Sequence, residues 1–518
     1  MQHAVILISK DSQLSSLRGA FTVAAAALLL QAPCVAQSMS HPRDLSALDS
    51  VTSGIINLPL TTTSADARNH FLQGQRELDL GRFFEANAHF KAAVTADTNF
   101  ALAYLNVGNT GNSLAEFRTN LELAERHATG ASDAERLQIQ IARQGLDNDL
   151  SGQLASAQKL VAQYPQSPRA YLALASVQGA LNRNVDARAS IMKAVGLSPR
   201  LLVAYTDLGN SYLFGEPKDF AKSLQQMQHA AALAPGEASL HDLLGDVYRA
   251  QNNLDQARFE YTRGHELNPT DASFLQQRGH VNSFAGHYAA ARADYDSAIA
   301  LGRGNEKAAF GTFRAYVSIH AGDPQAAIAE LNRLVAAIDT MGVPGAVGVK
   351  IGALSDVATI AIHTRDSAAA AQALKARTPL LLQQATASGS PAFQRSTDAN
   401  IAYFDGWFAA RNGDYTAAGQ AADRVAALVA QEQNPRKLEP LHQLKGYIAL
   451  YQGNFREAVS HFAMGNLDDP YIKYQYAVAL LGAGDKVKGN QLMRELSVYN
   501  FNNVGFALIR KDSRRPVS

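Results

Sequence analysis

Residues 238–271 read ASLHDLLGDVYRAQNNLDQARFEYTRGHELNPTD, with the small residue Gly245 in the first half and the small residue Ala257 in the second. Small residues at these positions let two antiparallel helices approach closely, while the larger Tyr261 fills space within the pair. Pro269 stops the second helix, because proline lacks an N–H group and restricts the residue before it. The stretch therefore predicts two packed antiparallel helices joined by a short turn.

The same spacing recurs along most of the chain. Gly279, Ala291 and Tyr295 follow their counterparts in 238–271 at a distance of 34 residues. A fixed period of this kind indicates a repeat architecture, and we expect about twelve units of helix, turn and helix. The units begin near residues 67, 101, 138, 168, 202, 238, 272, 308, 350, 399, 439 and 470, and those near 138, 350 and 470 are degenerate.

A common turn separates the paired helices. Glycine followed by Asp or Asn occurs in Gly322-Asp323-Pro324 and in Gly453-Asn454-Phe455. Glycine tolerates the left-handed conformation that ends a helix, and Asp or Asn then caps the next one. Because no stretch rich in β-forming residues is long enough for a second domain, we predict an all-α fold.

The repeats leave few segments for other structures. We expect a signal peptide at 1–36, an extended N-terminal segment at 37–66, a repeat array at 67–338, a degenerate repeat with flanking loops at 339–398, C-terminal repeats at 399–503 and a basic C-terminal tail at 504–518. The loops are inferred from Gly, Ser and Pro residues in 339–348 and 387–398. The basic residues of the tail are interpreted as a solvated helix end.

The first 36 residues have the layout of a secretory signal peptide. Lys10 and Arg18 precede a short apolar run at 21–30, and small residues follow at the expected cut. The run is too short to span a bilayer of about 30 Å comfortably. We therefore predict an exported chain, periplasmic or secreted, with no integral membrane span. Acylation of Cys34 is the alternative, which Pro33 disfavours because a small, flexible residue belongs there.

Composition bounds the classes of partner. The chain has 518 residues, of which 47% are hydrophobic and 8% aromatic, so it can bury a core. Its 47 Lys and Arg against 46 Asp and Glu leave no excess positive charge for gripping phosphates, and we predict no nucleic-acid partner. One cysteine excludes an internal disulfide framework and a cysteine-based metal cage.

No motif predicts a cofactor, a metal site or catalytic residues. Residues 147–152 resemble half of a calcium loop, but Gln158 replaces the glutamate that supplies two oxygen ligands. Residues 484–489 have the glycine spacing of a phosphate loop, but Asn490 replaces its lysine. Both are interpreted as turns between helices. The 14 histidines are scattered without a His-Glu-x-x-His pair, and we predict a protein that is not an enzyme.

The repeat resembles the tetratricopeptide repeat (TPR), a 34-residue helix–turn–helix unit. His241 stands where that family prefers tryptophan, and residues 58–94 and 502–515 are similar to the two ends of exported bacterial TPR proteins with no assigned activity. The resemblance implies an α-solenoid, a superhelix of stacked helix pairs with an extended concave surface. It also implies a protein or peptide partner, because the family generally binds such partners.

In this family the concave groove is lined mostly by the first helix of each unit. Its positions, carried over to this chain, give the candidate groove residues Asn109, Asn210, Asp242, Asp246, Arg249, Gln276, His280 and Tyr316. The mixture of donors, acceptors and one aromatic favours hydrogen bonding to an extended backbone. For any single residue, the alternative is a solvated helix face. The family's carboxylate clamp is not predicted, because its positions hold Leu172, Ser176, Thr206 and Leu243.

Two function classes stay open. The first is an exported scaffold that binds proteins or peptides and performs no catalysis of its own. The second is an accessory component that binds envelope polysaccharide or another polymer for a separate enzyme. A glycan groove should expose several aromatic faces, and the candidate lining has only Tyr316, so we favour a peptide. Trp407 is interpreted as repeat packing, with an exposed recognition aromatic as the alternative.

The signal-peptide interpretation gives the first testable prediction. We expect the exported protein to begin at Gln37, because the small residues Val35 and Ala36 precede this position. N-terminal sequencing of the exported protein measures this directly. A lipid-modified Cys34 at the N-terminus would contradict the soluble periplasmic or secreted form.

Overall fold

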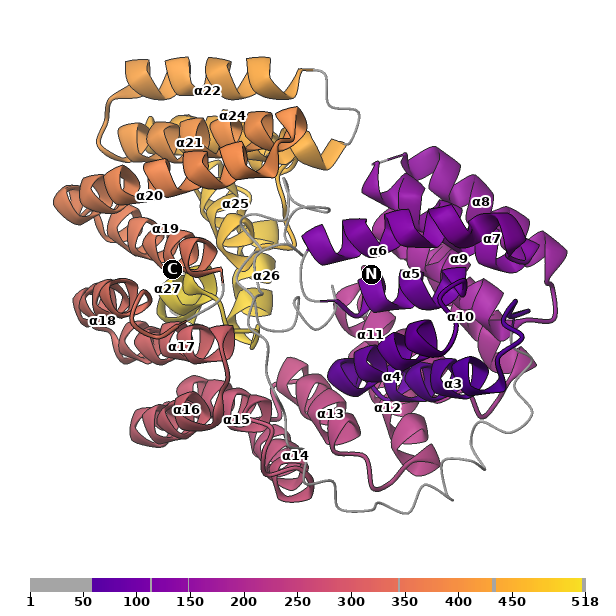
Figure 1. Cartoon of the computed structure of the whole chain (residues 1–518). Helices are drawn as coiled ribbons and strands as arrows, with labels where there is room; N and C mark the ends of the chain where they lie inside the picture. Colours follow the sequence, from indigo (N-terminus) through magenta and orange to yellow (C-terminus); the bar gives the residue numbers. More distant parts are fainter. Residues whose placement is uncertain (1–57, 112–113, 148, 343–344, 431–434, 515–518) are drawn as a thin grey trace. The chain divides into compact units, whose positions relative to one another are not determined.

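The computed structural model describes residues 58–111, 114–147, 149–342, 345–430 and 435–514. These residues form 25 α-helices, α3 to α27, with two short 3-10 helices and no β-strand in the described part (Figure 1). The predicted all-α class is confirmed. The signal peptide and Cys34 lie outside the described residues.

The helices form twelve consecutive antiparallel pairs, as the period predicted, and the chain divides into two compact units between Pro269 and Thr270. The first unit contains the pairs α3 (Ala65–Asp79) and α4 (Phe83–Ala96), α5 (Ala101–Asn109) and α6 (Leu114–His127), α7 (Asp133–Leu146) and α8 (Leu150–Gln163), α9 (Pro168–Ala180) and α10 (Asn184–Leu197), α11 (Leu202–Phe214) and α12 (Phe220–Leu233), and α13 (Ala238–Ala250) and α14 (Leu254–Leu267).

The second unit contains six more pairs and one additional helix. The pairs are α15 (Ser273–Ala285) and α16 (Tyr288–Leu301), α17 (Asn305–Ala321) and α18 (Pro324–Ala337), α19 (Ala346–Thr364) and α20 (Ser367–Ser388), α21 (Pro391–Arg411) and α22 (Tyr415–Val429), α23 (Glu439–Tyr451) and α24 (Phe455–Phe462), and α25 (Pro470–Gly482) and α26 (Lys486–Ser497); the additional helix is α27 (Val504–Ser513). The 3-10 helices are η2 (Ala128–Gly130) and η3 (Pro435–Leu438).

A glycine on the first helix packs against an aromatic ring on the second in four of the pairs. A Cβ atom added to Gly74 would lie 2.7 Å from the Phe90 ring, and one added to Gly446 would lie 2.8 Å from the Phe462 ring. A Cβ atom added to Gly245 would overlap the Tyr261 ring in the same way. These four pairs therefore pack closely because the first helix carries no side chain at the point of contact.

The turns within the pairs follow the predicted chemistry. Gly322 has φ +94°, and the carboxylate of Asp323 accepts a hydrogen bond of 2.9 Å from the backbone N–H of Ala326. The two motif-like segments are also turns. Asp149 caps α8 by accepting from Gly152 N–H at 2.9 Å, and Asp485 caps α26.

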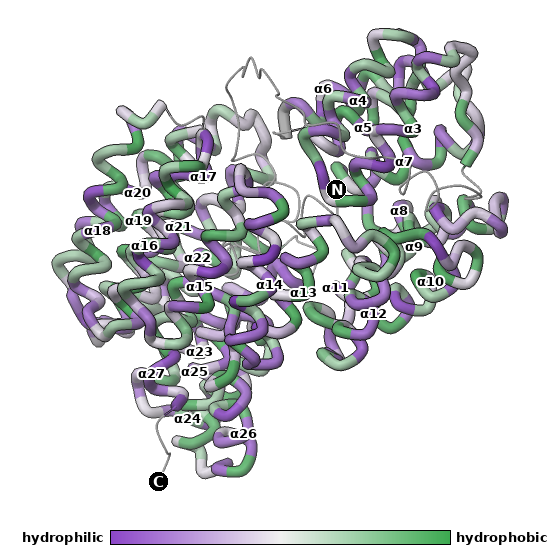
Figure 2. Tube along the Cα trace, turned by 90° about the horizontal axis from the view of Figure 1, so that it is seen from below, coloured by the Kyte–Doolittle hydropathy of each residue, from purple (hydrophilic) through white to green (hydrophobic). Residues whose placement is uncertain are grey.

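Successive first helices also contact one another, as α11 does with α13 and α15 does with α17. Since the first helices approach each other in this way, they form the inner row of each unit, while the second helices lie outside them. Figure 2 shows hydrophobic and hydrophilic residues interleaved along the helices, as expected when each helix has one apolar stripe.

The first unit closes on itself through the turn between α3 and α4. The Arg82 guanidinium binds the Glu237 carboxylate with two contacts of 2.7 and 2.6 Å, and Arg169 binds Asp79 at 3.1 and 2.7 Å. Leu80 packs in a cluster with residues of α11 and α13. The first repeat is thus joined to the fourth, fifth and sixth repeats at the starts of their first helices.

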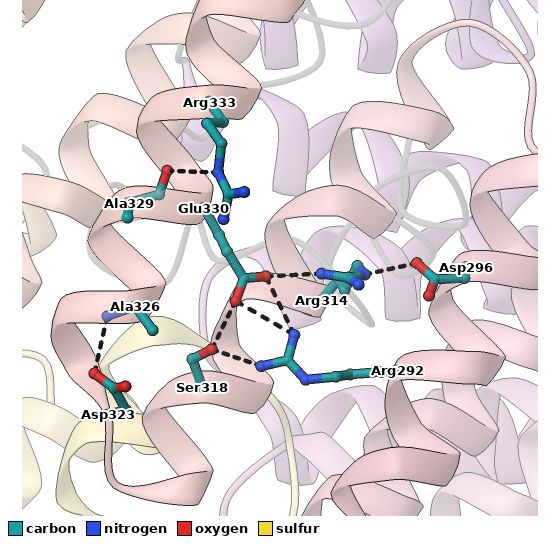
Figure 3. Close-up of polar contacts among 9 residues, drawn as sticks. All are labelled: Arg292, Asp296, Arg314, Ser318, Asp323, Ala326, Ala329, Glu330 and Arg333. Atoms are coloured by element: carbon teal, nitrogen blue, oxygen red, sulfur yellow. Dashed lines mark hydrogen bonds and ion pairs between the residues drawn. The ribbon is translucent and has the colours of Figure 1, made fainter.

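Charged side chains join neighbouring pairs in the second unit (Figure 3). Glu330 on α18 accepts from Arg314 on α17 at 2.9 Å, from Ser318 at 2.7 Å and from Arg292 on α16 at 3.3 Å. Arg314 also donates to Asp296 at 2.6 Å. One carboxylate thus receives three donors from two other helices. This network fixes the position of the α15–α16 pair relative to the α17–α18 pair.

Two expected boundaries are wrong. The loop expected at 387–398 is only Gly389 and Ser390, because α20 continues to Ser388 and about the first two turns of α21 fill the rest of the segment. Ser390 caps α21 by accepting from Phe393 N–H at 3.3 Å, and Pro391 occupies the first helical position, where proline is well tolerated. The Ser and Pro residues that suggested a loop are therefore the start signal of a helix.

The basic tail expected at 504–518 is also wrong for its described residues. Residues 504–513 form α27, which packs against α17, α19, α25 and α26 (Figure 1). Phe506 and Ile509 are fully buried, and Arg510 is 5% exposed. The Arg510 guanidinium lies over the Phe284 ring at 4.8 Å and donates to the Phe284 carbonyl at 3.1 Å. The apolar residues between the charges hold this helix in the core.

The apolar helix α19 is the one described helix that is long and apolar enough to cross a membrane. However, 56% of its apolar stretch is buried, and it packs against α18, α20 and α27. We therefore interpret α19 as a core helix of the second unit. Trp407 on α21 is 3% exposed and stacks on Tyr447 at 5.0 Å, so its interpretation as repeat packing is confirmed.

The close contact between helices predicts opposite effects of one substitution at two glycines. Gly245→Ala should destabilise the α13–α14 pair by about 1–3 kcal/mol, because the new methyl group overlaps the Tyr261 ring. Gly419→Ala on α22 should stabilise its pair by about 0.5–1 kcal/mol, since no atom lies within 4 Å of the added Cβ. Hydrogen exchange of the two pairs measures both effects. Equal effects at the two sites would contradict this packing.

Candidate functional site

The eight candidate groove residues all lie on first helices, but they fall in separate units. The first unit holds Asn109 on α5, Asn210 on α11, and Asp242, Asp246 and Arg249 on α13. The second unit holds Gln276 and His280 on α15 and Tyr316 on α17. Each group is described within its own unit.

Most of these side chains are not open to solvent. Asn109 and Asp242 are half-buried. The expectation of an accessible lining is not met at Asn210, Asp246, Arg249, Gln276, His280 and Tyr316, which are at most 8% exposed. For Asp246, Arg249, Gln276, His280 and Tyr316 the physical reason is that their polar groups bind other side chains of the same unit and thereby become part of the core.

In the first unit, Asp246 and Arg249 form a fully buried ion pair. Oδ1 of Asp246 accepts from the Arg249 guanidinium at 2.8 Å and from the Tyr261 hydroxyl at 2.7 Å. A buried charge must be paired and hydrogen-bonded to be tolerated, and this arrangement meets that condition. Burial raises the pKa of Tyr261 well above its usual value, so the hydroxyl stays protonated and remains a donor. The pair thus anchors α13 to α14 at the glycine contact.

Asn210 differs from the other residues of the first unit. Its side chain is 8% exposed, and its Oδ1 atom has no hydrogen-bond partner in the structure. A buried amide oxygen without a donor destabilises the fold by about 1–3 kcal/mol. This acceptor lies on the inner row, on a helix that contacts α13. Because this oxygen is also shielded from solvent, a donor from a ligand reaches it only when a neighbouring side chain moves aside.

In the second unit, His280 is the centre of a buried polar chain. Its Nε2 atom lies 3.1 Å from Gln276, and its Nδ1 atom lies 2.5 Å from the Tyr295 hydroxyl and 3.0 Å from the Asn502 amide. Asn502 lies 3.1 Å from His320 on α17. Because Asn502 lies two residues before the start of α27, these hydrogen bonds connect the end of the second unit to its first two helix pairs.

Tyr316 binds the carboxylate of Asp356, a residue that the sequence did not indicate. Its hydroxyl donates to Oδ2 of Asp356 on α19 at 2.6 Å, and the two side chains are 0% and 7% exposed. Burial raises the pKa of Asp356 to about 7, although the Tyr316 hydrogen bond acts in the opposite direction. Asp356 lies in a degenerate repeat, 40 residues from Tyr316, so no spacing rule connects the two residues.

A pocket of about 390 Å³ lies beside the first repeats of the first unit. The Glu135 carboxylate on its wall already accepts from Thr61 and from Ser132 N–H. His127 stacks on Tyr104 at 5.3 Å. Since its polar groups are engaged in capping α7 and in packing, we assign no role to this pocket.

The repeat geometry identifies the family. Twelve helix pairs follow one another, and the recurring glycine contacts an aromatic side chain 16 residues later in Gly74–Phe90, Gly245–Tyr261, Gly279–Tyr295 and Gly446–Phe462. The chain is a tetratricopeptide-repeat solenoid. No family model matches its sequence.

Two curated proteins share part of this TPR sequence. The chain is 27% identical over 172 residues to anaphase-promoting complex subunit 3 of Schizosaccharomyces pombe, covering 33% of this chain and 25% of that protein. It is 28% identical over 141 residues to the mouse protein O-mannosyl-transferase TMTC1, covering 26% of this chain and 15% of that protein. The chain thus spans a quarter or less of the length of these relatives.

Three solved structures are similar to the TPR solenoid. The hetero-tetramer Cut9–Hcn1 of the anaphase-promoting complex has a TM-score of 0.36 and 14% identity, covering 87% of this chain and 76% of that one. MamA has a TM-score of 0.29 and 21% identity, covering 34% and 94%. YrrB, described as a TPR protein with an unusual peptide-binding site, has a TM-score of 0.26 and 18% identity, covering 35% and 91%.

The buried Asp356 predicts a pH-dependent stability. Its pKa is raised in the folded chain, so it contributes stability at low pH that is lost as the pH rises from about 4 to about 7. The asparagine of the Asp356→Asn variant cannot ionise. The free energy of unfolding of this variant, minus that of the unchanged protein, should therefore increase over that pH range and level off above it. Hydrogen exchange of α17 and α19 at several pH values measures the difference.

The matched control is Asp423→Asn, at an exposed position on α22. Its stability should follow the unchanged protein over the same pH range. A difference between the Asp356→Asn variant and the unchanged protein that stays constant with pH would contradict the assignment.

Proposed function

We propose that this protein is an exported, noncatalytic scaffold that binds a protein or peptide segment along the inner row of its first unit. The observation that carries the proposal is the buried Asn210 Oδ1 atom, which lacks a donor in the structure. An extended peptide offers backbone N–H groups that would satisfy such an acceptor. Export rests on the layout of residues 1–36.

The half-buried Asp242 supplies a second acceptor on the neighbouring first helix. Acceptors on consecutive helices suit a ligand that runs across the repeats, because an extended chain presents N–H groups at regular intervals. The buried pair Asp246–Arg249 has a different role in this proposal. It is bound to Tyr261 within the pair and holds α13 in place, so it positions the surface without touching the ligand.

The candidate lining favours a peptide over a polysaccharide. Stacking on sugars needs exposed aromatic faces, yet Tyr316 is 0% and Tyr205 is 7% exposed. Exposed rings do occur at Phe84 and Phe259, but these residues lie on the second helices α4 and α14, outside the inner row. We therefore retain the protein or peptide partner as the proposed ligand.

The proposal predicts that Asn210→Ala combined with Asp242→Ala weakens binding of the native partner. Loss of one or two hydrogen bonds of about 1–1.5 kcal/mol each should weaken binding by about tenfold or more. The partner is first identified by cross-linking the exported protein in its source cells, and its affinity for each purified variant is then measured. Helicity should change little, and the unfolding temperature should not fall through Asn210→Ala, because this substitution removes a buried acceptor without a donor.

The control replaces Gln256 and Arg258 by alanine on the second helix of the same pair. Arg258 pairs with the exposed Asp255, so this change removes comparable polar groups from the outer side. Full affinity of the Asn210 and Asp242 variant, or a loss that occurs only in the control, would show that the inner row is not the binding site.

A further inference from the structure

Three helix pairs place a histidine of the first helix against a polar residue of the second. The pairs are His70 with His89, His241 with Glu260, and His442 with His461, and the two members are 19 residues apart in every case. The second member is the seventh residue of its helix each time. The repeat register therefore brings these side chains together by construction, at the position where His241 replaces the family's tryptophan.

The two histidine pairs have nearly the same geometry although they lie in different units. The Nδ1 atoms are 3.4 Å apart in His70–His89 and 3.3 Å apart in His442–His461. The ring centroids are 5.7 and 5.5 Å apart, with interplanar angles of 32° and 31°. The agreement indicates one recurring arrangement set by the helix pair.

The spacing of the nitrogen atoms fits a shared metal ion. Two imidazole nitrogens bound to one ion at about 2.1 Å with a tetrahedral angle lie about 3.4 Å apart. A direct N–H···N hydrogen bond would bring the two nitrogens closer, to about 3.0 Å. The two Nδ1 atoms in each pair thus stand at the separation of chelating ligands.

The partial burial of the histidines is compatible with ion access. All four histidines are half-buried, so each pair retains access to solvent. Nε2 of His70 lies 3.9 Å from the Asp66 carboxylate, one helical turn earlier. This distance is too long for a hydrogen bond, so Asp66 contributes negative charge near the site without fixing the tautomer of His70. Among the described residues no group of three or more His, Cys, Asp or Glu is arranged to hold a metal, so each pair supplies two ligands.

We propose that His70–His89 and His442–His461 are two separate sites for a divalent transition-metal ion, each with two imidazole ligands and water in the remaining positions. Imidazole ligands favour Zn²⁺, Ni²⁺ and Cu²⁺ over Mg²⁺ and Ca²⁺. Because each site joins a first helix to its second helix, a bound ion stabilises the α3–α4 pair and the α23–α24 pair. The inference is independent of the proposed peptide binding.

The mixed pair His241–Glu260 is not included. Its Nδ1 and Oε2 atoms are 2.8 Å apart, which is a direct hydrogen bond. The Glu260 carboxylate also accepts from Gln256 at 3.0 Å. Both groups already have partners, so this position should remain metal-free.

Calorimetric titration of the untagged full chain with Zn²⁺ at about pH 7.5, where most imidazoles are neutral, tests the proposal. His89→Gln should remove one bound ion, and His89→Gln with His461→Gln should remove two. The remaining single histidines should bind at least about tenfold more weakly. Zn²⁺ should slow hydrogen exchange in α3–α4 and α23–α24 in the unchanged protein only.

The matched control is His229→Gln, which removes a histidine that stacks on Tyr205 at 4.2 Å and has no histidine partner among the described residues. It should bind as many ions as the unchanged protein. His70→Gln provides a second variant of the first site, should His89→Gln perturb the fold. Equal stoichiometry in the unchanged protein and the double variant, or no bound Zn²⁺ in either, would overturn the proposal.

Discussion

The contact between a bare glycine on one helix and an aromatic ring on the next is the interaction on which the rest of the structure depends. It recurs in repeats as far apart as Gly74–Phe90 and Gly446–Phe462. Dispersion contacts need close approach, and the missing side chain allows the ring to lie directly against the partner helix. Once the pair is closed in this way, the register of the two helices is fixed. The facing polar positions, including the histidine pairs, then follow from the same register.

Closure of each unit is a second constraint, built on contacts between segments far apart in sequence. In the first unit, Arg82 reaches Glu237, and in the second unit, Arg510 lies against Phe284. A solenoid whose repeats touched only their neighbours would leave its inner row fully open. Here the turn between α3 and α4, and the helix α27, occupy part of that row. The polar inner residues consequently have intramolecular partners, and Asn210 stands out because its Oδ1 atom has none.

The sequence predicted the fold well because the repeat is local. Glycine, alanine and aromatic positions recur at fixed spacing, and the turn residues mark each pair, so twelve pairs could be counted. The site was predicted less well, because burial depends on contacts beyond the repeat. Nothing near Tyr316 in sequence indicates Asp356, and nothing in the basic end of the chain indicates that α27 packs on α17. The histidine pairs could have been found from their common separation of 19 residues once the helix register was known.

We infer that stability resides in separate helix pairs coupled mainly to their neighbours, with additional contacts that join the ends of each unit. Native-state hydrogen exchange resolved along the described residues tests this most directly. We expect exchange free energies to fall into blocks that coincide with helix pairs, with a boundary near Pro269 and a shared block for α17, α19 and α27. A single exchange free energy for all amides from Ala65 to Ser513 would contradict it.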